Sequence, residues 1–137
     1  MKEVLMRCGI WLAAALLIGV TAAAQEARGG EGFLGTWSGT WDGAGTGGFE
    51  LTLEKDKEGV LTCRVSVTGE PAYKATCKTV TFDAKKMTAK YDFPPDERAE
   101  VILEATFEEK TAKGTWALRE KGTGNEAAAG GWAVSRK

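Results

Sequence analysis

Eight short runs of this sequence alternate apolar and polar residues with a period of two. Because successive side chains of a strand point to opposite faces, this period predicts strands with one buried face each. The runs cover residues 36–41, 49–54, 61–67, 78–82, 87–93, 99–107, 114–118 and 132–136. Turn-forming residues such as glycine, proline and aspartate separate the runs. No stretch has a helical stripe of useful length, so the predicted fold class is all-β.

The short connections predict that consecutive strands pair as antiparallel hairpins. An eight-stranded meander can close on itself, which removes exposed strand edges. A two-sheet sandwich would need long crossovers, and residues 120–131 form the single long connection, with room for one helical turn at residues 125–130. The favoured architecture is therefore a single eight-stranded antiparallel up-and-down barrel.

Residues 1–24 differ in composition from the rest of the chain. Lys2 and Arg7 precede an apolar run over residues 9–20, and Ala22–Ala24 fit an A-x-A cleavage site. This order is typical of a secretory signal peptide, and the apolar run is shorter than the roughly 20 residues of a membrane span. We therefore predict a signal peptide at 1–24, a flexible lead-in at 25–33 and the barrel domain at 34–137. The mature protein would be exported, either periplasmic or secreted, with no membrane span.

Charge and composition argue against several classes of function. The chain has formal charge −1, and removal of the leader, which contributes +1, leaves −2. Nucleic acids and anionic membranes require a basic face, so neither is an expected partner. The chain has no histidine, the commonest general base, and the carboxylates fall on the polar faces of the runs. The glycine-rich segment 42–48 lacks the Lys-Ser/Thr of a phosphate loop. We expect no enzyme activity, no metal and no cofactor.

Two cysteines remain after cleavage of the leader, Cys63 and Cys77. A hairpin centred near Glu70 would place them directly opposite each other, as a non-hydrogen-bonded pair. Export permits a disulfide, but two buried thiols fit the pattern equally well. The parity of Cys77 conflicts with that of Val80 and Phe82, so all three can face inward only if a bulge lies between 77 and 80.

After the predicted leader, all four tryptophans follow glycine by one or two positions, in GTW at 35–37, 39–41 and 114–116 and in GGW at 130–132. Glycine permits a sharp bend in a barrel strand and leaves room on the inner wall. The neighbouring indole can then lie across the backbone and close the barrel end. This interpretation requires no ligand.

The GTW at the start of the first strand resembles the opening of the calycin group, which comprises lipocalins, fatty-acid-binding proteins and avidins. GTWSG, LTCRV, VTF and KGTW also resemble a small secreted barrel domain of bacterial proteins. The resemblance implies a lipocalin-like barrel in which Arg136 packs over Trp37. The chain lacks the helix that follows a lipocalin barrel, and the polar ligand contacts of avidin have no counterparts, so no biotin site is carried over.

The inward aromatic residues are the candidate ligand-binding residues. They are Trp41, Phe49, Tyr91, Phe93, Trp116 and Trp132. An eight-stranded barrel either is filled by its side chains or holds one small ligand. We predict an exported, non-catalytic barrel that binds an apolar small molecule or lipid in its interior. The alternative is a structural or protein-interaction module with a filled barrel, whose function lies on the loops at 42–48 and 120–131.

Overall fold

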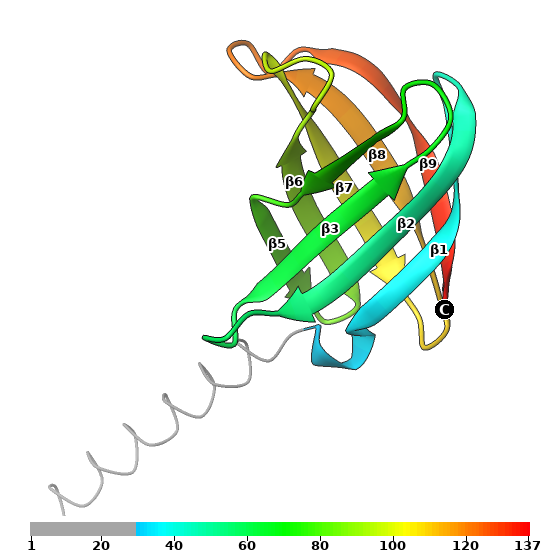
Figure 1. The fold of residues 1–137 in the computed structure, drawn as a ribbon, viewed down its shortest axis with the longest axis vertical. Helices are drawn as coiled ribbons and strands as arrows, with labels where there is room; N and C mark the ends of the chain where they lie inside the picture. The colour runs from blue at the N-terminus through cyan, green and yellow to red at the C-terminus, as the bar shows by residue number, and fades with distance from the viewer. Residues whose placement is uncertain (1–29) are drawn as a thin grey trace, which may run out of the picture.

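Nine antiparallel strands and one short 3₁₀ helix make up residues 30–137, the part of the chain that this computed structural model describes (Figure 1). The elements are η1 (Glu31–Phe33), β1 (Gly35–Asp42), β2 (Thr46–Lys55), β3 (Leu61–Val67), β4 (Tyr73–Thr76), β5 (Thr79–Asp83), β6 (Lys86–Asp92), β7 (Ala99–Phe107), β8 (Thr111–Glu120) and β9 (Glu126–Arg136). The all-β up-and-down architecture is confirmed, with nine strands rather than eight. The predicted signal peptide and residues 25–29 lie outside the described residues.

The strands form one sheet in the order β4-β3-β2-β1-β9-β8-β7-β6-β5. Strands that are neighbours in the sheet are also neighbours in sequence, with one exception: β1, the first strand of the chain, pairs with β9, the last. In that pairing Trp37 lies opposite Arg136 and Trp41 lies opposite Trp132. Figure 1 shows how the sheet curls around a single interior, with β1, β2 and β3 facing β6, β7 and β8. The buried apolar residues of all these strands therefore meet in one core.

The additional strand arises where the chain changes its pairing partner. The Cys77 N–H donates to the Cys63 carbonyl of β3 at 2.8 Å, and the next residue, Lys78, donates its N–H to the Lys90 carbonyl of β6 at 2.7 Å. The predicted run at 78–82 corresponds to β5, which pairs with β6, and β4 is a ninth strand outside the predicted runs, paired with β3. This break reverses the parity of the inward residues, as the conflict between Cys77 and Val80 required.

We call the place where the chain passes from the β3–β4 ladder to the β5–β6 ladder the seam. A disulfide joins Cys63 to Cys77 there, with 5.2 Å between the Cα atoms. The predicted hairpin register holds, since Arg64 pairs with Thr76 and Val67 with Tyr73. The expectation of a non-hydrogen-bonded pair was wrong, because the backbone hydrogen bond from Cys77 to Cys63 spans the same position. The disulfide therefore reinforces the end of the β3–β4 ladder, just before the chain begins to pair with β6.

The long loop predicted at 120–131 is mostly strand. β9 begins at Glu126, and its alanines pair with β8, with Ala128 opposite Leu118 across a register shift after Leu118. Alanine and glycine carry little strand propensity, but pairing with β8 overrides it. Space explains the glycine at 130, since a Cβ there would lie 1.9 Å from the Asp42 carbonyl oxygen.

The glycines that precede the tryptophans mark places where neighbouring strands approach closely. A Cβ on Gly39 would lie 1.9 Å from the Ala133 carbonyl oxygen, and one on Gly114 would lie 1.9 Å from that of Glu104. No larger residue fits at these positions without separating the strands. The glycines thus allow the tight coiling that a small barrel requires, and the tryptophans that follow fill its interior.

Candidate functional site

One end of the barrel is closed by aromatic side chains. Trp37 and Phe107 are fully buried there and meet edge to face, with 4.9 Å between ring centroids. Phe33, from the 3₁₀ helix that lies across the bottom of the barrel in Figure 1, stacks on Phe82 at 5.3 Å and accepts the Trp37 indole N–H through its carbonyl at 2.9 Å. The flexible lead-in predicted at 25–33 therefore includes a turn that packs against the core.

Arg136 covers the same end from outside. Its guanidinium lies 4.5 Å from the centroid of the Trp37 ring, as the resemblance to lipocalins implied. It also donates hydrogen bonds to the carbonyls of Gly32, Leu34 and Glu109. A cation over an indole face is attracted by the ring's negative charge distribution. Arg136 thus holds the lead-in and the loop after β7 over Trp37 at the closed end.

The opposite end of the barrel contains a pocket of about 120 Å³. All six predicted ligand-binding residues line it: Trp41, Phe49, Tyr91, Phe93, Trp116 and Trp132. They come from β1, β2, β6, the segment after β6, β8 and β9. Val101 and Leu103 of β7 also line it. The structure therefore brings these residues together around one predominantly apolar space, as strand parity indicated.

The indole of Trp41 is held in this wall by a hydrogen bond that depends on a glycine. Its N–H donates to the Thr68 carbonyl at 2.9 Å. A Cβ on Gly47 would lie 1.9 Å from that carbonyl oxygen and 2.6 Å from the indole nitrogen. Gly47 therefore leaves the space that lets the ring reach across β2, so the glycine-rich segment 42–48 serves the pocket wall.

Tyr73 is a pocket residue that sequence reasoning missed. It comes from β4, and its hydroxyl lies 2.7 Å from that of Tyr91 on β6. The two tyrosines bridge the seam toward the open end, where the ladders of β4 and β5 diverge. The alternation of Tyr73, Ala75 and Cys77 was the available signal, but the segment is short and follows a turn. Burial raises the pKa of both hydroxyls, that of Tyr91 far above its ordinary value.

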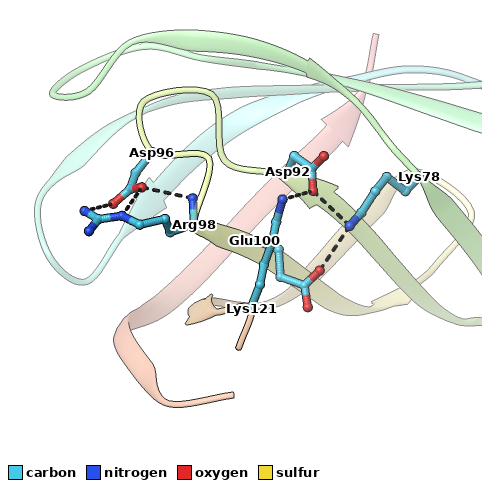
Figure 2. Close-up of polar contacts among 6 residues, drawn as sticks. All are labelled: Lys78, Asp92, Asp96, Arg98, Glu100 and Lys121. Carbon is cyan, nitrogen blue, oxygen red and sulfur yellow. Dashed lines mark hydrogen bonds and ion pairs between the residues drawn. The ribbon is translucent and has the colours of Figure 1, made fainter. Parts of the chain in front are cut away.

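Four charged residues form ion pairs beside the pocket residues Tyr91 and Phe93, and we call them the rim residues: Lys78, Asp92, Glu100 and Lys121 (Figure 2). The Lys78 ammonium lies 2.8 Å from the Asp92 carboxylate and 3.2 Å from that of Glu100, and Lys121 lies 2.9 Å from Asp92. The hydrogen bond to Lys78, followed by that to Lys121, lowers the pKa of Asp92. The hydrogen bond to Asp92, followed by that to Glu100, raises the pKa of Lys78.

These ion pairs connect four segments next to the wall. Lys78 lies between β4 and β5, Asp92 and Glu100 flank the corner from β6 to β7, and Lys121 follows β8. Asp92 stands between the pocket residues Tyr91 and Phe93. Arg98 and Asp96, also drawn in Figure 2, pair within the corner itself at 3.1 Å. The four-segment group therefore fixes the rim from outside, whereas the Arg98–Asp96 pair is local.

Two further observations concern the described part of the chain. Within residues 30–137, no three histidine, cysteine, aspartate or glutamate side chains are grouped so that they could hold a metal ion. The same residues contain no helix of the length and apolar character that crossing a membrane demands.

Comparison with known proteins shows the fold but no family. No family model matches the chain, and no curated protein matches it. Two solved structures are similar. A redesigned beta barrel, b11L5F_LGL, superimposes with a TM-score of 0.57 at 16% identity, covering 80% of this chain and 95% of its own. A structure of EF1p2_mFAP2b bound to DFHBI superimposes with a TM-score of 0.59 at 14% identity, covering 82% and 98%. Both support a β-barrel, and membership of the calycin group stays a prediction.

Proposed function

We propose that this protein is an exported, non-catalytic binding protein that holds an apolar small molecule in the pocket at the open end of its barrel. The observation that carries the proposal is the contrast between the filled closed end and the aromatic-lined space of about 120 Å³ opposite it. Ligand pockets of proteins combine apolar walls with a few polar groups in this way.

Two further features support binding. A barrel of similar fold has been solved in complex with DFHBI. The rings that line the pocket are held in fixed orientations by contacts with one another, such as Phe49 with Trp132 at 5.0 Å and Tyr73 with Phe93 at 5.4 Å. A wall that is already ordered loses little conformational entropy when a ligand enters.

The export part of the proposal rests on the leader and on the disulfide. Disulfides persist in oxidising compartments, and the Cys63–Cys77 pair is suited to the periplasm or the cell exterior. Expression of the full chain should yield a mature protein that begins at Gln25, which intact-mass measurement of the secreted fraction would show. Retention of residues 1–24 in all of the product would contradict this part.

Native mass spectrometry of protein secreted from its own leader and never refolded tests the binding part. We expect a copurified apolar molecule that is lost on denaturation, or, for empty protein, a saturable change in tryptophan emission on addition of toluene. Ala128→Phe would fill the pocket from β9 and should abolish both signals. Ala133→Phe is the matched control, because Ala133 lies on the exposed face of the same strand and lines no part of the pocket.

The same experiment distinguishes the alternative. An empty protein that toluene does not affect would overturn the proposal. The pocket would then be an imperfection of a filled barrel, and the turns that remain of the two predicted loops, at 43–45 and 121–125, would become the place to search for a protein partner.

A further inference from the structure

The hydrogen-bond donors of the pocket wall are almost all in use. Each of its three indole N–H groups donates to a backbone carbonyl at 2.8 to 3.0 Å: Trp41 to Thr68, Trp116 to Asp42 and Trp132 to Thr115. These nitrogens cannot turn toward a ligand without leaving a carbonyl unpaired. Among the residues that line the pocket, the tyrosine hydroxyls are then the side-chain donors that remain.

Tyr73 and Tyr91 together carry one hydrogen more than their mutual bond requires. Two hydroxyls have two hydrogens, and the contact of 2.7 Å between their oxygens uses one of them. Within residues 30–137, neither hydroxyl makes a side-chain hydrogen bond to any other group. Because burial keeps both tyrosines protonated far above neutral pH, the second hydrogen is always present. Tyr91 is almost completely buried and Tyr73 is partly buried in a predominantly apolar wall, so an acceptor on a ligand would pair an O–H that no described protein group accepts.

The charges around the pocket determine what kind of acceptor can enter. The wall contains no lysine or arginine, and its one charged residue is Glu70, an exposed carboxylate. A ligand carboxylate would lose its water without gaining a counter-ion and would also be repelled by Glu70. A neutral carbonyl oxygen has neither disadvantage. The electrostatics therefore favour ketones, amides or lactones over fatty acids.

The size and shape of the pocket limit the ligand further. A volume of about 120 Å³ is close to that of a cavity of ~150 Å³ known to accept benzene. Long acyl chains do not fit within it. Rings favour rings through edge-to-face and offset contacts, and seven of the pocket residues are aromatic.

We propose that the pocket selects a neutral, planar, ring-sized molecule whose carbonyl oxygen accepts a hydrogen bond from the Tyr73–Tyr91 hydroxyl pair. This inference rests on the proposed function and names the ligand class for the same site. It predicts selectivity between molecules of equal shape, which apolar burial alone would not produce.

Three probes of nearly identical shape test the proposal. Acetophenone carries a neutral carbonyl, α-methylstyrene replaces its oxygen with a methylene, and benzoate replaces its methyl with an anionic oxygen. We expect the secreted protein to bind acetophenone about five- to tenfold more tightly than α-methylstyrene, which is the effect of one net hydrogen bond. Benzoate should bind at least tenfold more weakly than either. Dissociation constants from tryptophan quenching provide the comparison.

The double variant Tyr73→Phe/Tyr91→Phe removes both hydroxyls and keeps the rings. It should bind α-methylstyrene as the unchanged protein does and lose its preference for acetophenone. A single variant would be less informative, because the remaining hydroxyl could still donate. The carbonyl stretch of bound ¹³C-acetophenone provides a test that needs no variant: it should lie below its frequency in hexane.

Each outcome has a definite meaning. Equal affinity for acetophenone and α-methylstyrene, with an unshifted carbonyl stretch, would overturn the acceptor proposal and leave the proposed function standing. Persistence of the preference in a folded double variant would remove the tyrosines from the site. Tighter binding of benzoate would overturn the neutral class. If none of the three probes binds, the proposed function itself fails.

Discussion

The two ends of the barrel are built from the same motif and differ in what covers it. At the closed end, the tryptophan of the first GTW is sealed by Phe33 and Arg136, and Trp37 is completely buried. At the open end, the next copy places Trp41 beside Trp116 at 5.9 Å, where both rings line the pocket and Trp116 is only partly buried. A Gly-x-Trp unit therefore provides a ring at a barrel end. Whether that ring is core or pocket wall depends on segments distant in sequence.

The largest expected difference between the ends is in stability. Trp37→Ala should lower the free energy of unfolding by about 3 to 5 kcal/mol, because it empties a fully buried site that the closed end cannot refill. Trp116→Ala should cost less than about 2 kcal/mol, because that ring is already partly exposed. Urea unfolding of both variants provides the measurement. Equal losses would show that the open end is packed like the closed one.

The disulfide should matter more for stability than for binding. It closes a loop of sequence separation 14. It lies in the part of the seam toward the closed end, whereas the Tyr73–Tyr91 pair lies in the part toward the pocket. Cys63→Ser/Cys77→Ser should lower the free energy of unfolding by about 3 kcal/mol through the entropy of the unfolded chain. We expect ligand affinity to change by less than about threefold in variant protein that remains folded. A large loss of affinity at unchanged stability would place the disulfide in the pocket's support.

The cover on Trp37 can be weakened without emptying the site. Arg136→Met keeps an apolar stem over the indole and removes the guanidinium with its three carbonyl contacts. We expect a loss of about 1 kcal/mol, since the group is exposed and water can replace part of what it provides. Faster hydrogen exchange of the Trp37 indole N–H, with that of Trp132 unchanged, would locate the effect at the closed end. Uniform acceleration at both indoles would contradict this.

The features of the barrel that could be predicted from the sequence are those set by the alternation of residues within one strand. Parity alone placed Trp41, Phe49 and Tyr91 on one inner face, because a strand's period of two fixes which side each residue faces. Parity also indicated the break between Cys77 and Val80. Tyr73 was missed because β4 has four residues, directly follows a turn and ends just before that break, so its alternation is too short to stand out as a strand.

Two other features leave no periodic signal in the sequence. Phe33 belongs to a single 3₁₀ turn, and its contacts with Phe82 and Phe107 join residues far apart in the chain. The rim ion pairs join surface charges on four segments, and any of these could have paired elsewhere. The alanine-rich start of β9 gave a misleading signal, because alanine and glycine have little strand propensity, and its strand conformation comes from pairing with β8.

The smallest expected effect on stability concerns the rim residues. The pH dependence of stability shows its direction. The pKa of Asp92 is lowered in the folded protein from the ordinary 3.8, chiefly by Lys78 and then by Lys121. Its contribution to stability is therefore present above that value and is lost as the pH falls through the lower, folded pKa. Asp92→Asn should make the loss of stability between about pH 4 and pH 2 shallower than in the unchanged protein.

Asp96→Asn is the matched control for this rim prediction. The pKa of Asp96 is lowered as well, but its partner Arg98 lies two residues away in the same turn. Both variants should therefore reduce the acid dependence, whereas only Asp92→Asn should also weaken binding of a pocket ligand at pH 7, because only Asp92 connects the ends of β6 and β8 beside Tyr91. Salt near 1 M should screen these exposed pairs and remove most of that difference. Equal ligand affinity of the two variants at low salt would mean that the rim ion pairs do not contribute to binding, and that the aromatic rings alone maintain the pocket at the open end.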